Sequence, residues 1–273
     1  MRVVALLATY NERRFIEGCL GHLDEQGVDV YLIDNASTDG TVALAEPWLE
    51  RNLLGIETFP REDGVYNWRA LLQRKEEVAE QLTEEREAGW LIHLDPDEVR
   101  LAPPGDGTLA EALARVERDG YNAVNFLEYT FVPSREQPDH DHPEFQRTLH
   151  TYYPFGPFFP HQLKAWKAAD APTPDLASSG GHRVSFRGLR MYPQSFPMKH
   201  YLFLSVPHAI EKYVERDYDP REVRRGWHGW RAELTARDIS LPSESELRVS
   251  RSDDDLDPST PRKSHCIDRV TIG

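Results

Sequence analysis

The first half of the chain alternates strand-like and helix-like segments, and this alternation restricts the fold more than any other feature of the sequence. Short apolar runs, typical of buried strands, occur at residues 3–8, 28–33, 55–59 and 90–94. Capped or amphipathic stretches predict helices at 14–26, 41–52, 66–88 and 108–118, before a further strand at 122–132. Parallel neighbours need a crossover connection, which these helices supply. We therefore predict an α/β fold, with a mostly parallel sheet flanked by helices.

The second half is less regular and is rich in proline and aromatic residues. It predicts a loop at 133–143, short strands at 162–166, 183–186 and 198–203, and C-terminal helices at 207–216 and 220–234. The stretch TYYPFGPFFP at 151–160 suits either core packing or an acceptor platform, and Trp227 and Trp230 suit docking of a terminal helix. The polar residues 243–265 are a candidate lid or disordered tail.

Composition narrows the class of protein. The 273 residues carry a formal net charge of −14, which disfavours nucleic acid and anionic membranes as partners. The purest apolar run of the chain has six residues. It is much shorter than a membrane-spanning helix or the apolar region of a signal peptide. The two cysteines, Cys19 and Cys266, imply no disulfide framework, so we expect a cytoplasmic protein.

Polar clusters follow three of the predicted strands. They are Thr9–Glu12, Asp34–Asp39 and Asp95–Glu98. Ligands of parallel sheets bind beyond the carboxyl ends of the strands, so we expect these clusters to meet at one edge. Lys75 and Arg86 are expected on the charged outer face of the long helix at 66–88.

Two of these clusters suggest specific chemistry. Asp95 and Asp97 are two residues apart on extended backbone, so both carboxylates point to one side and offer hard oxygen ligands for Mg²⁺ or Mn²⁺. An acidic turn is the alternative, and the position after an apolar strand favours the metal. Asp34 can accept a hydrogen bond from a nucleobase, while its loop can equally act as a helix cap.

Three motifs together resemble the opening of family-2 glycosyltransferases. They are Ala8-Thr9-Tyr10-Asn11-Glu12, Ile33-Asp34-Asn35-Ala36-Ser37-Thr38-Asp39-Gly40-Thr41 and His93-Leu94-Asp95-Pro96-Asp97-Glu98. The resemblance covers about residues 1–130 and implies the GT-A fold, a Rossmann-like sheet, with use of nucleotide sugars.

The resemblance also implies roles for individual residues. The nucleotide-sugar site would contain Thr9, Tyr10, Asn11, Glu12, Asp34, Asn35, Arg69, Asp95 and Pro96. Thr9 and Asp34 would hold the base or ribose. Asp95 and Asp97 would serve the ribose and the metal–diphosphate, and His200, in Lys199-His200-Tyr201, would add a further metal or phosphate ligand; a histidine on a half-buried strand is the alternative.

Inverting members of this family need a general base for the acceptor hydroxyl. Related lipopolysaccharide-core enzymes carry a His-Glu pair where this chain has His182-Arg183, so the expected carboxylate is missing. His182 and Asp175 are the leading candidates for the base, followed by Glu128.

The resemblance predicts an inverting, metal-dependent glycosyltransferase of polysaccharide or glycoconjugate synthesis. Its GT-A domain would span 1–204, with a nucleotide-sugar half (1–100) and an acceptor half (101–204), followed by a C-terminal helical extension and polar tail (205–273). Expected partners are a nucleotide diphosphate sugar, with a UDP-sugar as first choice, and a carbohydrate or glycolipid acceptor. Nucleic acid is not expected, and homo-oligomer formation is left open.

Two other functions remain open. Residues 91–99 also resemble the nucleophile strand of haloacid-dehalogenase-like phosphatases, with Asp95 as nucleophile and Asp97 as acid. That strand usually opens its domain, and the late acidic run Asp253–Asp255 follows no apolar strand here. An inactive sugar-binding module is the third possibility, supported by Arg183 at the position of the family carboxylate.

Overall fold

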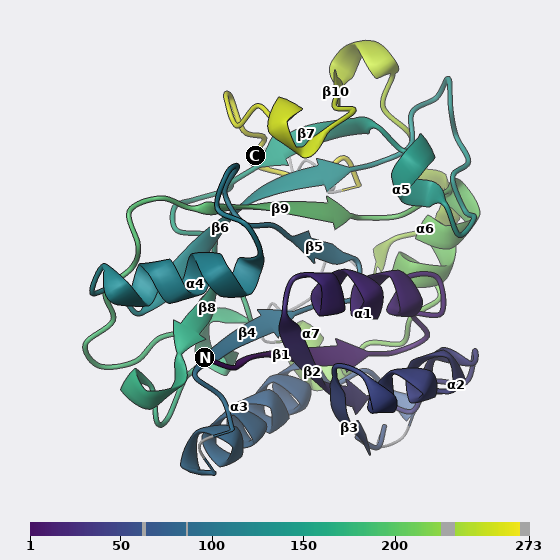
Figure 1. Ribbon diagram of the computed structural model, residues 1–273. Coiled ribbons are helices and arrows are strands. Elements are labelled where there is room, and N and C mark those ends of the chain that lie inside the picture. The colour runs from purple at the N-terminus through teal and green to yellow at the C-terminus, as the bar shows by residue number, and fades with distance from the viewer. Residues whose placement is uncertain (62–63, 86, 225–232, 268–273) are drawn as a thin grey trace. The chain divides into compact units, whose positions relative to one another are not determined.

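The computed structural model describes residues 1–61, 64–85, 87–224 and 233–267 (Figure 1). The chain divides into two units. Unit 1 contains residues 1–61, 68–126 and 160–198, and unit 2 contains residues 62–67, 127–159 and 199–273. Strands β6 (Ala123–Phe131) and β9 (Phe196–Tyr201) run through both units, and each unit is described by itself.

The sheet of unit 1 is built around four parallel strands. Their order is β4 (Trp90–Leu94), β1 (Val3–Thr9), β2 (Val28–Asp34) and β3 (Leu53–Thr58). Strand β8 (Gln162–Lys167) is antiparallel to β4, and residues 123–126 of β6 are antiparallel to β8. All seven residues of β1 are buried, as expected for a strand covered on both faces. The α/β fold with a mostly parallel sheet flanked by helices is confirmed.

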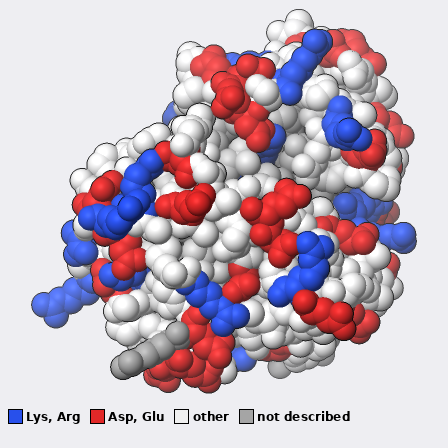
Figure 2. All heavy atoms as spheres, viewed as in Figure 1, with Lys and Arg blue, Asp and Glu red and all other residues white. Residues whose placement is uncertain are grey.

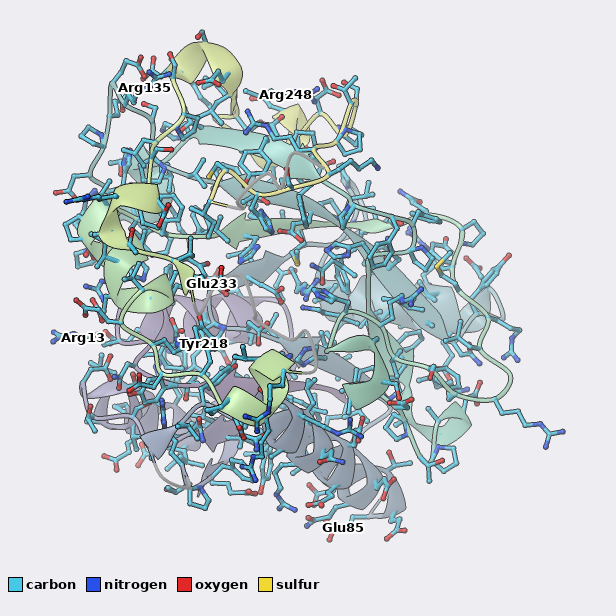
Figure 3. All side chains as sticks on the ribbon, turned by 180° about the vertical axis from the view of Figure 1, so that it is seen from behind. Arg13, Glu85, Arg135, Tyr218, Glu233 and Arg248 are labelled. Atoms are coloured by element: carbon cyan, nitrogen blue, oxygen red, sulfur yellow. The ribbon has the colours of Figure 1, made fainter. Side chains whose placement is uncertain are left out.

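The two faces of this sheet are covered by different helices, as Figures 1 and 3 show. The alternate residues Val3, Ala5 and Leu7 share one core with α1 (Ile16–Glu25) and α4 (Leu109–Arg118). On the opposite face, α3 (Trp68–Glu84) places Lys75 against His93 of β4. Glu85, labelled in Figure 3, immediately follows α3. Side chains alternate across a strand, so His93 faces α3 while Ile92 and Leu94 face the other core.

Capping side chains and proline set the boundaries of these helices. Thr108 caps α4 through a capping box with Glu111, as the predicted start at 108 requires. The single helix predicted at 41–52 is instead a short α2 (Thr41–Ala45) followed by a 3₁₀ turn, Glu46–Glu50. Pro47 lies in the first turn of that segment, and proline has no N–H to continue the α-helical hydrogen bonding of α2.

Shorter elements complete unit 1. Strand β5 (Glu98–Arg100) pairs with β9, and the predicted strand at 183–186 forms only the isolated bridges Leu163–Arg183 and Asp175–Ser185. The 3₁₀ turns Ala168–Asp170 and Ala177–Ser179 lie between β8 and β9.

Unit 2 is organised around the second half of β6. This half is antiparallel to β7 (Thr151–Phe155), which pairs in turn with β10 (Arg248–Val249). The helices are α5 (Phe145–Thr148), α6 (Val206–Tyr213) and α7 (Pro220–Arg224), with 3₁₀ turns at Ala236–Asp238, Glu244–Glu246 and Asp253–Asp255. The remainder of the predicted helix at 220–234, including Trp227 and Trp230, lies largely outside the described residues.

The polar C-terminal segment packs against the rest of unit 2 and is not a disordered tail. Arg262 N–H donates to the Pro154 carbonyl at 2.8 Å, and Ile267 is buried in the core of this unit. Arg248, labelled in Figure 3, pairs with Asp257. These contacts offset the low apolar content that suggested disorder.

The aromatic stretch at 151–160 is divided between core and surface. Tyr152 and Tyr153 are buried, whereas Phe158 and Phe159 are exposed. Acidic and basic side chains are interspersed on the face shown in Figure 2. None of the described helices is long and apolar enough to span a lipid bilayer.

Candidate active site

The parallel register brings the polar strand ends of unit 1 together. Thr9 is the partner of Asp34 across β1 and β2, and Leu7 is the partner of Leu94 across β1 and β4. Strands β1, β2 and β4 therefore end at the same edge of the sheet, at Thr9, Asp34 and Leu94. The three polar clusters meet there, as their positions after strands predict.

Asp34 is held in a fixed orientation at this edge. Thr9 Oγ1 donates to Asp34 Oδ1 at 3.1 Å, and the Ser37 backbone N–H donates to Oδ2 at 2.9 Å. Thr9 and Asp34 are each 2% exposed. A carboxylate fixed by two donors presents its remaining acceptor positions in defined directions, which suits recognition of a ligand N–H or O–H.

The loops after β1 and β2 bind one another through side chains. Thr38 N–H donates to Asn11 Oδ1 at 2.8 Å, and Glu12 N–H donates to Thr41 Oγ1 at the same distance. Asn35 Nδ2 donates to the Phe59 carbonyl at 3.1 Å. Asn11 and Ala36 have positive φ angles of 56° and 59°. A left-handed alanine costs free energy, so this loop stores local strain.

Aromatic and cationic groups flank the same loops. The Arg61 guanidinium lies 3.7 Å from the centroid of the Tyr10 ring. Arg69, the predicted cationic contact of the nucleotide, is exposed in the first turn of α3, which is a separate element from these loops. Arg13, labelled in Figure 3, is exposed, and its backbone N–H binds Asp39.

Asp95 and Asp97 differ in environment. The Asp95 side chain is 31% exposed, whereas Asp97 is 6% exposed and Pro96 between them is buried. Within the described ranges, no group of three or more His, Cys, Asp or Glu side chains is arranged to hold a metal ion. Mg²⁺ is commonly bound by one or two carboxylates together with water and substrate phosphates. Residues 95–97 do not continue the strand as predicted but form a turn, in which Glu98 N–H donates to the Asp95 carbonyl at 3.1 Å. Asp95, which is partly exposed, is the carboxylate of the pair that a metal could reach.

Buried charged side chains lie beneath the motif. Lys75 Nζ is 3.8 Å from Asp95 Oδ1, and Lys164 Nζ is 3.8 Å from Asp95 Oδ2. Lys164 also pairs with Glu98 at 3.0 Å, and Glu98 pairs with Arg100 at 2.5 Å. Lys75 and Arg100 are fully buried. The prediction that Lys75 lies on the outer face of α3 is therefore wrong, because the helix turns this residue toward the sheet.

The interior changes the proton affinity of two of these groups. Burial lowers the pKa of Lys75 to about 8, while the Asp95 carboxylate acts in the opposite direction. Burial, aided by the Lys75 charge, holds the pKa of His93 well below its usual range. His93 Nδ1 lies 2.9 Å from Lys75 Nζ and accepts from the ammonium, so neutral His93 carries its proton on Nε2.

Helix α3 also anchors the segment that carries the predicted base. Glu76 Oε1 accepts from the backbone N–H groups of Leu176 and Ala177, at 2.6 and 2.7 Å. Trp68 Nε1 donates to the Gly180 carbonyl at 2.9 Å. Both contacts hold the loop 175–183 against the helix that contributes Lys75.

The two leading base candidates have different surroundings. Asp175 Oδ1 accepts from Ser178 N–H at 2.9 Å, and the Asp175 backbone pairs with Ser185, so this carboxylate caps its own loop. His182 is exposed and stacks on buried His161, with ring centroids 4.8 Å apart. Exposure leaves the His182 ring accessible to an acceptor.

His200 belongs to unit 2, as does Glu128. His200 Nδ1 lies 2.7 Å from Glu128 Oε1, which also accepts from Thr130 Oγ1 at 3.0 Å. The Glu128 side chain is 1% exposed and that of His200 is 17% exposed. A buried carboxylate that orients an imidazole in this way serves both metal-binding and proton-transferring histidines.

Sequence patterns alone did not identify the charged residues beneath the motif. Lys75 is three or four residues from Leu71, Leu72, Val78 and Ala79, which is the spacing of one helical face. Lys164 stands inside the apolar strand QLKAWK. A lysine embedded in an apolar pattern is the signal that could have identified both residues.

The chain shows distant likeness to solved structures. The chain is 14% identical to residues 1–349 of S. aureus TarS in complex with UDP, with a TM-score of 0.45, over 74% of this chain and 61% of that one. It is 20% identical to the mannosyltransferase PcManGT from Pyrobaculum calidifontis in complex with GDP-Man and Mn²⁺, with a TM-score of 0.40, over 88% and 66%. The chain thus spans less than two thirds of each of these structures.

No curated protein matches the sequence. The sequence pattern of the family described as "Glycosyl transferase family 2" matches residues 5–164, which is more than half of the chain. The match includes β1, β2, β4 and the polar clusters at their ends. This chain belongs to glycosyl transferase family 2.

Proposed function

We propose that this protein transfers a sugar from a nucleotide diphosphate sugar to an acceptor hydroxyl, with inversion at the anomeric carbon, in polysaccharide or glycoconjugate synthesis. The supporting observation is the fixed Thr9–Asp34 pair on the edge at which β4, the strand before Asp95, also ends. Family membership makes this edge the natural donor site. A UDP-sugar is the first donor to test, a GDP-sugar is the second, and the cytoplasm is the proposed compartment.

Residues 1–100 would bind the nucleotide sugar. Asp34, oriented by Thr9 and Ser37, would accept a hydrogen bond from the base or ribose. Tyr10, beneath the Arg61 guanidinium, would offer an aromatic surface beside it. Asp95 and Asp97 would hold Mn²⁺ or Mg²⁺, which when bound neutralises charge on the leaving diphosphate.

The acceptor half needs a group that removes a proton from the attacking hydroxyl. His182 is our first candidate because it is exposed and its loop is held by Trp68 and Glu76. The Glu128–His200 pair is the second, since the buried carboxylate would stabilise a protonated imidazole. Asp175 is a weaker candidate, because it caps its own loop.

Ligand-dependent melting tests the donor site directly. We expect UDP with Mn²⁺ to raise the melting temperature, because a ligand that binds only the native state stabilises it. Asp97→Asn should abolish this shift, whereas Asp257→Asn, on the exposed C-terminal segment, should retain it. If neither UDP nor GDP shifts the wild-type protein, with or without Mn²⁺, the proposed donor site is wrong.

Product analysis separates this function from the alternatives. Nucleotide binding with no sugar transferred to any of a broad panel of acceptors would favour an inactive sugar-binding module. Phosphate release from simple phosphoesters would favour a phosphatase with Asp95 as nucleophile. With an active protein, His182→Ala and His200→Ala identify the base by which of them lowers kcat and removes the ascending limb of the pH profile.

A further inference from the structure

The carboxylate of Asp95 has a cationic neighbour at each of its oxygens. Lys75 Nζ lies 3.8 Å from Oδ1, and Lys164 Nζ lies 3.8 Å from Oδ2. The side chains of the two lysines are 0% and 5% exposed, whereas that of Asp95 is 31% exposed. The ammonium groups therefore approach the carboxylate from the protein interior, and its open side faces solvent.

These lysines belong to a larger cluster of charged side chains. Lys164 also pairs with Glu98, and Arg100 binds the other oxygen of Glu98. Lys75 is fixed by its hydrogen bond to the Leu94 carbonyl at 3.0 Å. Two carboxylates, Asp95 and Glu98, thus lie among three cationic side chains, Lys75, Lys164 and Arg100, which are part of the protein and cannot diffuse away.

We infer that Lys75 and Lys164 are built-in counter-ions of Asp95, which weaken its binding of a free divalent cation and make metal binding depend on the nucleotide diphosphate. This inference rests on the proposed function, because it assumes that Asp95 and Asp97 form the metal edge of a donor site. The two lysines would act as positioning residues and would not contact the substrate.

Repulsion between like charges determines whether the two lysines weaken or strengthen metal binding. A divalent cation on the open side of Asp95 meets two ammonium charges a few ångström beyond the same carboxylate, and like charges at that distance repel. A bound diphosphate adds negative charge at the edge and offsets this repulsion. The metal and the nucleotide then bind with positive coupling, and each strengthens binding of the other by the same factor.

The test measures Mn²⁺ alone, by calorimetry at low ionic strength, without nucleotide. Removing one ammonium by Lys164→Met should tighten Mn²⁺ binding by on the order of tenfold. Lys167→Met is the matched control, because Lys167 lies on the same strand and pairs with Glu117, away from Asp95. Its Mn²⁺ affinity should stay within about twofold of the wild type. Lys75→Met should act in the same direction as Lys164→Met.

If the two lysines only stabilised the fold, replacing either one would disturb Asp95, and Mn²⁺ would bind more weakly instead of more tightly. Unchanged or weaker Mn²⁺ binding by a folded Lys164→Met or Lys75→Met protein would overturn the inference. If both variants fail to fold, the inference is tested on wild-type protein by measuring its Mn²⁺ affinity with and without UDP. The inference requires UDP to tighten Mn²⁺ binding, and equal Mn²⁺ affinity with and without bound UDP would also overturn it. Failure of all nucleotides to bind wild-type protein would instead refute the proposed donor site.

Discussion

The indole N–H of Trp68 donates a hydrogen bond to the carbonyl oxygen of Gly180, at 2.9 Å, across 112 positions of the chain. Trp68 begins α3, and Gly180 lies two residues before His182. Glu76, two turns further along α3, binds the backbone at Leu176 and Ala177. The loop with the first candidate base is thus attached at both ends to the helix that carries Lys75.

Replacing Trp68 with Phe should release the second half of this loop. The lost hydrogen bond should lower the free energy of unfolding by about 1 kcal/mol, as measured by urea denaturation. If His182 acts from this loop, kcat should fall while KM for the donor changes little. Trp48→Phe is the control, because Trp48 lies in the 3₁₀ turn after α2. Equal kcat values for Trp68→Phe and Trp48→Phe would show that the position of this loop does not affect the reaction.

Gly181 has no room for a side chain. Its φ is +84°, and an added Cβ would lie 3.0 Å from His93 Nε2 and 3.1 Å from both Leu72 and Trp68. We expect Gly181→Ala to lower stability by about 2–4 kcal/mol, from backbone strain and overpacking together. Gly180→Ala isolates the strain, since Gly180 has a φ of +67° and an added Cβ there would have no neighbour within 4 Å. It should cost only about 1 kcal/mol, measured in the same urea titration.

Ala36 offers a stabilising change at the nucleotide edge. Its φ of 59° is unfavourable for alanine, and glycine adopts it freely. Ala36→Gly should raise the free energy of unfolding by about 0.5–1 kcal/mol, after the greater flexibility of glycine in the unfolded chain is included. Ala110→Gly, within α4, should lower it by about 1 kcal/mol. A loss of stability in Ala36→Gly would show that the loop is not strained at this residue.

His93 should make the protein sensitive to acid. Because its pKa is well below the usual value of 6.5, the ring stays neutral in the folded protein while the unfolded chain takes up a proton. The unfolded state then binds more protons below about pH 6.5, and stability falls there by up to about 1.4 kcal/mol per pH unit. Above that pH this contribution is constant.

The acid sensitivity is measured as the difference in unfolding free energy between pH 7.5 and pH 5.5. His93→Gln should lose less stability than the wild type over this range, because glutamine does not titrate. His142→Gln, at an exposed histidine, should behave like the wild type. If His93→Gln and the wild type lose equal stability, His93 is not the group that resists protonation.

The parallel direction of the strands, and the meeting of the polar strand ends at one edge, could be predicted from sequence because they follow from local patterns and general rules of connection. Apolar runs separated by helices require parallel strands, and parallel strands end at one edge. Thr9 and Asp34 are therefore expected to lie together, and the register pairs them directly. The order of such motifs along the chain is therefore enough to predict that they lie close together in space.

Only the tertiary structure decided how charges and loops are arranged around that edge. Lys75 stands among glutamates in sequence, a pattern typical of a solvent-facing residue, yet helix rotation buries it beside Asp95. Lys164 reaches the same carboxylate from a strand far along the chain. Local charge patterns report neither which helical face meets the sheet nor which distant group balances a buried ion. Both depend on packing between segments that the chain brings together only when it folds.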